Sequence, residues 1–253
     1  MNTEERRRGI VSTARRDGAV DVNRLADLFQ VAKGTIRRDL RAIEETGLIR
    51  RTHGGAYPVE SAGFETTLAT RTTRNVPQKS RIAVAAADLL GDAKTVFVDE
   101  GFTPQLIAEA LPRDRPLTVV TPSLVAATAL ADAEKIVVLL LGGRVRGRTM
   151  ATVDHWASRM LADFAIDLAY VGANGISREY GLTTPDPAVG DVKGQATRSA
   201  RRRVFTGVHT KFGAVNFCRF ADVRDFEAIV TDVGLPSAEA QRYSLLGPQV
   251  IRV

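Results

Sequence analysis

The sequence is poor in several residue types, and each shortage argues against a class of protein. Cysteine occurs once in 253 residues, as Cys218, so no disulfide can form within the chain. The histidines, His53, His155 and His209, lack the spacing of a zinc site, and we expect no metal and no cofactor. No run of eighteen apolar residues occurs, which argues against a membrane span or a membrane partner. The N-terminal M-N-T-E-E-R-R-R lacks the apolar centre of a signal peptide, and together with the single cysteine it predicts a cytoplasmic location.

Positive charge is concentrated at the N-terminal end of the chain. Residues 1–57 hold 12 Lys and Arg against 8 Asp and Glu, a net charge of +4, whereas the whole chain carries +6. A hydrophobic content of 44% and a charged content of 25% are ordinary globular values. The asymmetry therefore predicts a nucleic-acid-binding module joined to a nearly neutral domain.

Two short helical patterns in residues 20–49 flank a turn at Val31-Ala32-Lys33. In the first pattern, Val22, Leu25, Ala26 and Phe29 share one helix face. In the second, apolar residues mark a buried face and cations occupy the other side. This arrangement is typical of a helix-turn-helix, which we place at about 20–39. A preceding helix over 3–17 is expected to pack behind it, and the run Arg6-Arg7-Arg8 is expected on its solvated face.

A strand, a glycine turn and a second strand follow at 48–57 and predict a two-stranded wing. Arg50, Arg51 and His53 of the wing would lie near DNA phosphates, as would Lys33 at the start of the second helix. Thr35, Arg37 and Arg38 would face bases in the major groove, with Arg41 on the same side. The candidate DNA-binding residues are therefore Lys33, Thr35, Arg37, Arg38, Arg41, Arg50, Arg51 and His53.

T-I-R-R-D-L at 35–40 and E-x-x-G-L-I-R-R-x-H-G-G at 44–55 resemble the winged helix-turn-helix of the DeoR family of bacterial transcription regulators. One departure is Ala32, where the family usually has a serine that caps the recognition helix. Alanine is a poor N-cap, which is expected to cost about 1 kcal/mol of helix stability.

Residues 58–77 contain Pro58, Ser61, Gly63, several threonines and Pro77, and they predict a linker in which Phe64 and Leu68 anchor to the next domain. From Gln78 to Val253, buried strands alternate with helices, which predicts an α/β domain with a mostly parallel sheet covered on both faces. The strands are expected at 95–98, 117–121, 135–141, 166–171, 203–206, 226–231 and 249–253. The helices are expected at 82–90, 104–111, 123–131, 153–162, 187–201 and 237–244.

Four loops follow strands of this sheet, where ligands gather in open α/β folds. They begin at Asp99, Thr121, Gly142 and Gly172. The first two lead into helices, whose free N–H groups suit an anion, and lysines could supply charge. The candidate effector-binding residues are Asp99, Glu100, Gly101, Phe102, Thr103, Thr121, Ser123, Gly142, Gly143, Asn174, Lys193 and Lys211.

D-x-G-x-T at 99–103, L-G-G at 141–143, G-A-N-G-I-S at 172–177 and H-T-K-F-G at 209–213 are similar to the DeoR-family effector domain. The resemblance implies a fold related to ribose-5-phosphate isomerase and glucosamine-6-phosphate deaminase. It also implies a sugar phosphate or similar inducer, with its phosphate at the first two loops. The chain departs from the family pattern at Glu100, Phe102, Pro122, Asp154 and Val208. Because an acidic Glu100 and a bulky Phe102 disfavour a bulky or doubly charged phosphate, an altered effector is expected.

Three functions are compatible with this sequence. The favoured one is a sequence-specific regulator, a repressor of carbohydrate metabolism genes, that binds an operator in double-stranded DNA as a homodimer or homotetramer and is released by a small effector. The second is a sugar-phosphate isomerase or deaminase, but the segment after Asn174 holds no carboxylate until Glu179. The third is an unspecific DNA-compacting protein, for which a large α/β domain is superfluous.

Overall fold

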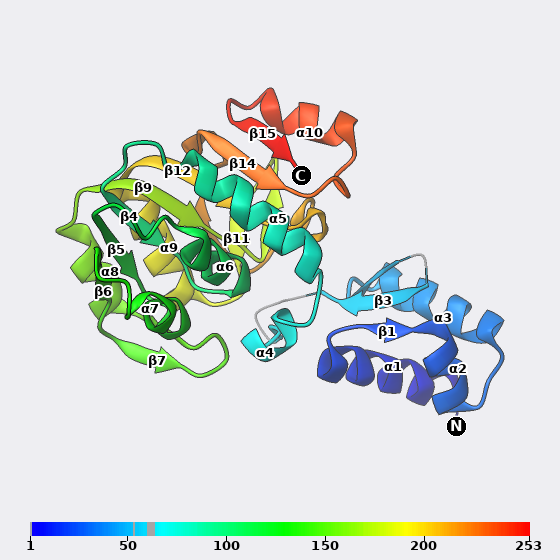
Figure 1. Ribbon diagram of the computed structural model, residues 1–253. Coiled ribbons are helices and arrows are strands. Elements are labelled where there is room, and N and C mark those ends of the chain that lie inside the picture. The colour runs from blue at the N-terminus through cyan, green and yellow to red at the C-terminus, as the bar shows by residue number, and fades with distance from the viewer. Residues whose placement is uncertain (1, 53, 60–63) are drawn as a thin grey trace. The chain divides into compact units, whose positions relative to one another are not determined.

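The computed structural model describes residues 2–52, 54–59 and 64–253, and the chain divides into two compact units, Met1–Thr66 and Thr67–Val253 (Figure 1). Residues 67–77, which the sequence places in the linker, belong to the second unit and include α4 (Leu68–Arg71). Phe64 contacts the first unit, because the Arg15 guanidinium lies 5.1 Å from the centre of its ring. No helix among the described residues is long and apolar enough to cross a bilayer.

The first unit is a helix-turn-helix followed by a wing. The predicted first helix, helix-turn-helix and wing strands are all confirmed. The wing also pairs with a short strand that the sequence did not predict, so that the unit contains a three-stranded sheet in the order β1-β3-β2. The elements are α1 (Thr3–Asp17), β1 (Val20–Asp21), α2 (Val22–Phe29), α3 (Lys33–Glu45), β2 (Ile49–Arg51) and β3 (Gly55–Pro58).

The core of this unit joins all three helices to the sheet, with Ile10, Leu25, Leu40 and Ile49 buried together. Burial of such side chains stabilises each by about 1.5–3 kcal/mol and holds helices that are too short to be stable alone. At the sheet, Gly55 lies so close to β1 that a Cβ atom there would sit 1.8 Å from the Val20 carbonyl oxygen. Only glycine permits this approach.

The second unit is built on seven parallel strands in the order β15-β14-β12-β9-β4-β5-β6. Each of the seven predicted strands is present, and the predicted α/β fold with a parallel sheet is confirmed. The strands are β4 (Thr95–Val98), β5 (Leu117–Thr121), β6 (Ile136–Leu140), β9 (Ile166–Val171), β12 (Ala200–Thr206), β14 (Ala228–Thr231) and β15 (Gln249–Arg252).

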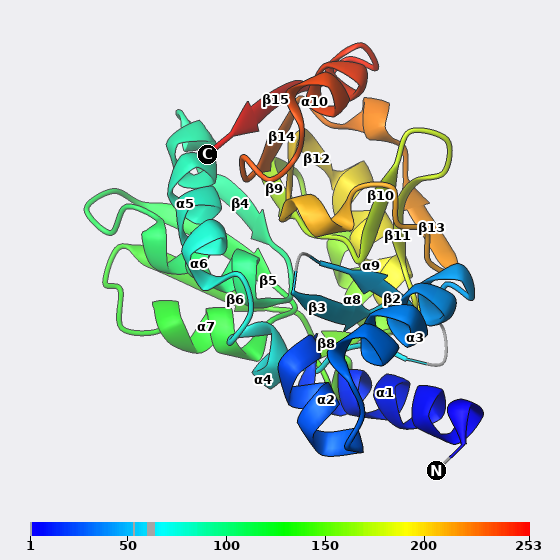
Figure 2. The ribbon, with the colours of Figure 1, turned by 90° about the vertical axis from the view of Figure 1, so that its right-hand side faces the viewer.

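Helices cover both faces of this sheet (Figure 2). One core packs against α5, α6 and α7, and the other packs against α8, α9 and α10. Two short helical turns, η1 (Asp88–Leu90) and η2 (His209–Lys211), flank the sheet, and a third, η3 (Val223–Asp225), precedes β14. The helices are α5 (Val76–Ala87), α6 (Phe102–Ala110), α7 (Leu124–Leu130), α8 (His155–Ala162), α9 (Pro187–Ser199) and α10 (Ser237–Ser244).

Two predictions of local structure were wrong or incomplete. The helix expected over 187–201 ends at Ser199, and β12 begins at Ala200, which pairs with Ile166 of β9. Pairing within the sheet here overrides the helix propensity of Ala and Arg. The sequence also did not predict five short antiparallel strands: the hairpin β7 (Arg144–Arg146) and β8 (Ala151–Val153), and a sheet of β10 (Gly175–Ser177), β11 (Gly181–Thr184) and β13 (Cys218–Ala221).

Candidate functional site

Helix α3 has one buried and one cationic side. Its apolar residues Ile36, Leu40 and Ile43 are buried in the core of the first unit. The predicted contact residues lie elsewhere on the helix, where Thr35 is half-buried and the four cations are exposed. Within the described residues, no ion pair or hydrogen bond occupies the side chains of these cations, which leaves them available to a polyanion. They are Lys33, Arg37, Arg38 and Arg41.

The expectation of a solvated run is met by the exposed Arg8 but is wrong for Arg6, and Arg7 is only half-exposed. Arg6 is buried, and its Nε donates to Asp39 Oδ2 over 2.6 Å. The Nε of Arg7 donates to Asp39 Oδ1 over 3.0 Å. Burial alone would raise the pKa of the Asp39 carboxyl, but the hydrogen bonds from the two arginines outweigh burial and lower it. Asp39 therefore fixes α3 to α1, and no local pattern in the sequence indicates this pair.

The start of α3 is weakly supported. Ala32 occupies the N-cap position and makes no side-chain hydrogen bond to the helix, as expected for alanine. Gly34 follows in the first turn, and a Cβ atom there would have no neighbour within 4 Å. A glycine inside a helix costs about 0.5–1 kcal/mol relative to alanine, and nothing in the fold requires it at this exposed position.

The wing positions the other predicted cations. Arg50 and Arg51 lie on β2, and Arg51 is exposed while Arg50 is half-buried. The Arg51 N–H donates to Glu44 Oε1 over 2.8 Å, and its guanidinium lies 3.7 Å from the other oxygen of this carboxylate. Glu44 thus ties the wing to the end of α3. The remaining predicted contact, His53, lies outside the described residues.

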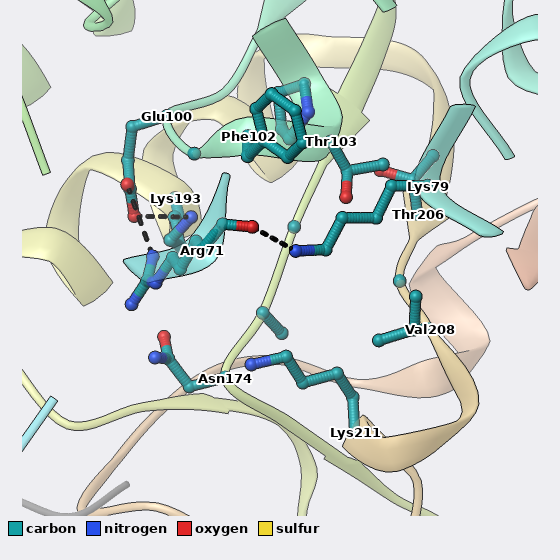
Figure 3. Close-up of a pocket in the computed structure, with 15 residues that line it drawn as sticks. Arg71, Lys79, Glu100, Phe102, Thr103, Asn174, Lys193, Thr206, Val208 and Lys211 are labelled. Carbon is teal, nitrogen blue, oxygen red and sulfur yellow. Dashed lines mark hydrogen bonds and ion pairs between the residues drawn. The ribbon is translucent and has the colours of Figure 1, made fainter. Parts of the chain in front are cut away.

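A pocket opens in the second unit at the carboxyl ends of β4, β9 and β12. Its lining brings together seven of the twelve predicted effector-binding residues, from Glu100 to Thr103 together with Asn174, Lys193 and Lys211 (Figure 3). Eight further residues complete the lining: Arg71, Lys79, Pro104, Gly172, Ala173, Thr206, Gly207 and Val208. No group of three His, Cys, Asp or Glu suited to a metal ion occurs in the described part of the chain.

A buried network of charges forms one wall of the pocket. The ammonium group of Lys193 donates to Asp99 Oδ2 and lies 3.4 Å from Glu100 Oε1. The other oxygen of Glu100 lies 3.8 Å from the Arg71 guanidinium. Burial alone would lower the pKa of Lys193, but the charges of Asp99 and Glu100 outweigh burial and raise it. Lys193 is therefore a cation, and its counter-ion is Asp99, which does not itself line the pocket.

Arg71 and Lys79 reach the pocket from α4 and α5, in or beside the segment that the sequence interprets as a linker. The Lys79 ammonium donates to the Arg71 carbonyl oxygen over 2.6 Å and lies 5.4 Å from the centre of the Phe102 ring. A signal for Lys79 was present in the sequence, because it precedes Ile82 and Ala83 by three and four residues on the buried face of α5. A cation on an apolar face is a candidate for a buried site.

The opposite wall carries Asn174 and Lys211 (Figure 3). Asn174 Oδ1 accepts a hydrogen bond from the Thr184 hydroxyl over 3.1 Å, which fixes its side chain. Lys211 ends η2, and this turn is held at its start by His209, whose N–H donates to Asp232 Oδ1 over 2.7 Å. The His209 ring also pairs with Asp232 over 2.6 Å, and this hydrogen bond raises the pKa of His209.

Five predicted effector-binding residues do not line this pocket: Asp99, which pairs with Lys193, and four others that each have a structural contact. Thr121 Oγ1 accepts from the Ser123 N–H over 3.0 Å, and Ser123 Oγ caps α7 by accepting from the Ala126 N–H over 3.2 Å. The Gly142 N–H contacts Met160 Sδ at 3.1 Å. A Cβ atom on Gly143 would lie 2.6 Å from the Val153 carbonyl oxygen, so the hairpin requires glycine there.

The two units together define a class of protein. A winged helix-turn-helix with free arginines on its second helix is joined to an α/β unit with a charged pocket, and this is the architecture of a transcription regulator with a sensor domain.

Comparison with known proteins identifies the family. The profile described as "DeoR-like helix-turn-helix domain" matches residues 6–62, and "DeoR C terminal sensor domain" matches residues 74–233. The chain belongs to the DeoR family of transcription regulators and is not an enzyme.

Relatives align over nearly the whole chain. The HTH-type transcriptional regulator GlpR of Haloferax volcanii is 34% identical over 99% of this chain and 98% of its own. The glycerol-3-phosphate regulon repressor of Escherichia coli K12 is 29% identical over 95% of each. Among solved structures, ribose 5-phosphate isomerase A from Methanocaldococcus jannaschii aligns over 55% of each chain, with a TM-score of 0.40 and 16% identity.

Proposed function

We propose that this chain is a repressor that binds an operator through α3 and the wing and leaves it when a small phosphorylated metabolite enters the pocket of the second unit. The observation that carries this proposal is the charge of the pocket. The proposed domain division is 1–57 for DNA binding, 58–77 for the connecting segment and 78–253 for sensing, with residues 67–77 of the connecting segment folded into the sensing unit. The relatives named as a regulator and as a glycerol-3-phosphate regulon repressor support the same class of function.

The charge balance of the pocket favours an anion. Four cations line it, Arg71, Lys79, Lys193 and Lys211, whereas two carboxylates belong to the same network, Asp99 and Glu100. The excess of two positive charges matches one phosphate monoester, which carries about −1.5 to −2 near pH 7. Gly101 supplies no side-chain cap to α6, so the N–H groups of Phe102 and Thr103 in its first turn remain for a ligand.

The position of Glu100 changes the expectation for the effector. As a free acidic group, Glu100 would disfavour a doubly charged phosphate, as expected from the sequence. In the structure, Glu100 is buried and forms ion pairs with Lys193 and Arg71, so its charge is already compensated. We therefore propose an effector with a single phosphate group and a small organic part, because the bulky Phe102 side chain lines the pocket and takes up space there.

Calorimetric titration of the full chain would test the pocket. The ligands are inorganic phosphate, a triose phosphate, a pentose phosphate and a hexose phosphate, each with its unphosphorylated form. We expect binding only of phosphorylated compounds. Replacing Lys211 with Gln should weaken binding by about 10-fold or more, the effect of losing one charge-assisted hydrogen bond. Lys94→Gln removes a lysine outside the pocket and is the control. Equal losses in both variants would contradict the proposal.

Fluorescence anisotropy with DNA from upstream of the gene would test the recognition helix. We expect Arg37→Ala and Arg38→Ala each to weaken the free energy of binding to the operator by about 1–3 kcal/mol. Each variant should also discriminate less between operator and scrambled DNA. The control is Arg16→Ala, because Arg16 is an exposed arginine of the same unit that lies on α1. An unchanged ratio of operator to scrambled affinity in both α3 variants would contradict the proposed role of α3.

A further inference from the structure

Helix α4 joins the pocket to the part of the chain that leads to the DNA-binding unit. It contains four residues, Leu68–Arg71, and the first unit ends just before it, at Thr66. A helix of four residues is not stable alone, so its conformation depends on contacts with the rest of the second unit. The groups that make these contacts therefore decide what can stabilise or release α4.

The start of α4 is held by contacts outside the pocket. Leu68 is buried, and its N–H donates to the Arg148 carbonyl oxygen over 2.8 Å. The Thr67 hydroxyl caps the helix by accepting from the Thr70 N–H over 3.3 Å. Among the described residues, the lining of the pocket includes none of these four, so a ligand in the pocket would not contact this end of α4.

The end of α4 is held by groups that line the pocket (Figure 3). The Arg71 carbonyl oxygen accepts from the Lys79 ammonium over 2.6 Å, and the Arg71 guanidinium lies 3.8 Å from Glu100 Oε2. A Cβ atom on Gly101 would lie 4.0 Å from Arg71 Nη1. The guanidinium is thus beside the start of α6, where the proposed phosphate would bind.

A phosphate in the pocket would strengthen the attachment of this end. Arg71 and Lys193 both pair with the Glu100 carboxylate, so two cations share one counter-ion. A guanidinium has five N–H donors and an ammonium has three, so Arg71 and Lys79 can bind a phosphate and keep the contacts that they already make. Because charge-assisted hydrogen bonds are the stronger kind, the added contacts should stabilise α4.

The state of α4 sets the length of the connection between the two units. As a helix, its four residues advance about 6 Å along the chain, whereas the same residues in extended form would span about 13 Å. The difference of about 7 Å is close to the rise of two base pairs in DNA. A change of this size is sufficient to alter which operator positions the DNA-binding unit can reach.

We propose that α4 couples the pocket to the DNA-binding unit: a phosphate bound in the pocket fixes α4 through Arg71 and keeps the connection short. This inference rests on the proposed function, because it takes the effector to be a phosphorylated compound. The coupling is reciprocal, so an operator that requires the longer connection weakens phosphate binding by the same factor.

Hydrogen exchange of the full chain, with and without saturating inorganic phosphate at constant ionic strength, tests this coupling. The reporting amides are those of Arg71 and Thr72, which donate to the carbonyl oxygens of Thr67 and Leu68. We expect phosphate to slow their exchange by at least about fivefold, the lower end of typical coupling between two sites. Saturation is established by calorimetry on the same sample.

Two pocket variants distinguish coupling from simple binding. Arg71→Gln should weaken phosphate binding and should also abolish the slower exchange of α4 when phosphate is saturating. The matched control is Lys211→Gln, which removes a cation of the opposite wall that lies on η2. Lys211→Gln should require more phosphate but show the full protection of α4 once saturated. A circular dichroism melt checks that both variants are folded.

Binding of operator DNA by the same variants provides the second measurement. Saturating phosphate should release the native chain and Lys211→Gln from the operator, but it should not release folded Arg71→Gln. Release of folded Arg71→Gln, or full protection of its α4, overturns the coupling. If phosphate binds the native chain and the exchange of α4 is unchanged, the coupling is overturned and the anion pocket of the proposed function stands. If calorimetry detects no phosphate binding, both are overturned.

Discussion

Replacement of Asp39 with Asn should selectively destabilise the DNA-binding unit. The Asp39 side chain is 3% exposed and accepts hydrogen bonds from Arg6 and Arg7, so the variant leaves the buried Arg6 guanidinium without a counter-charge. Removing one partner of a buried ion pair typically costs about 3–5 kcal/mol. A folded unit of this size has a free energy of unfolding of roughly 3–10 kcal/mol at about 0.05–0.15 kcal/mol per residue. The substitution therefore removes a third or more of the stability of the unit.

Hydrogen exchange of the full chain would measure this effect, because it reports protection in each unit separately. We expect peptides from α1 and α3 to lose protection by about two orders of magnitude or more, which corresponds to about 3 kcal/mol, while β9 and β12 remain unchanged. The matched control is Glu4→Gln, which breaks the exposed pair between Arg8 and Glu4 on the same helix. An exposed pair contributes about 0–1 kcal/mol, so this variant should resemble the native chain.

The stability of this unit should also depend on pH through Asp39. Because the pKa of Asp39 is lowered in the folded state, its contribution to stability is fully present above the unfolded value of about 3.9 and is lost as pH falls through the folded value. The loss of protection on acidification should therefore be smaller in Asp39→Asn than in the native chain. Equal losses of protection in Asp39→Asn and Glu4→Gln at neutral pH would refute the reasoning.

Three further variants and one pH series test the remaining conclusions. Ala32→Ser should cap α3 and raise the free energy of unfolding of the first unit by about 1 kcal/mol in urea denaturation; no gain would show that the cap is satisfied otherwise. Gly34→Ala should stabilise α3 by about 0.5–1 kcal/mol yet weaken DNA binding, if DNA approaches the backbone there; stabilisation with unchanged affinity would leave this glycine without a role at the DNA. Glu100→Gln should raise the affinity for a phosphorylated ligand by about fivefold or more, because Lys193 and Arg71, whose charges Glu100 partly compensates in the native chain, then attract the phosphate more strongly by about 1 kcal/mol; weaker binding in calorimetry would contradict the charge balance. The raised pKa of His209 means that the stability from its pair with Asp232 is present below about 6.5 and is lost as pH rises through the folded value, so the thermal midpoint of the second unit should fall over that range, and Asp232→Asn should abolish the dependence.

The elements of the first unit were predictable because their signals are local. The spacing of Leu25, Ile36 and Leu40 fixes which face of each helix is buried, and the residues that end each helix lie next to it in sequence. The pair between Arg6 and Asp39 was not predictable in the same way. The two residues are 33 positions apart, and a run of arginines near the N-terminus has the same appearance whether it is paired or solvated.

The pocket was predictable in part. Glu100 and Asn174 follow strands that are neighbours in a parallel sheet, so their loops meet at one edge. Ser123 also follows a strand, but its hydroxyl caps α7, and the sequence pattern is the same for a cap as for a ligand contact. Arg71 and Lys79 were missed because residues 58–77 have the composition of a linker, and composition does not reveal that part of this segment folds against the sheet.

The close contact between Gly55 and Val20 limits how this regulator could be retargeted to new operators. Strand β3 of the wing hydrogen-bonds to β1, which precedes α2. The wing is therefore attached to the helix-turn-helix through a backbone contact that does not involve α3. A chimaera in which only α3 is exchanged keeps this backbone contact. A chimaera with the wing of another regulator must keep a glycine at position 55, because any side chain there would collide with the backbone of Val20.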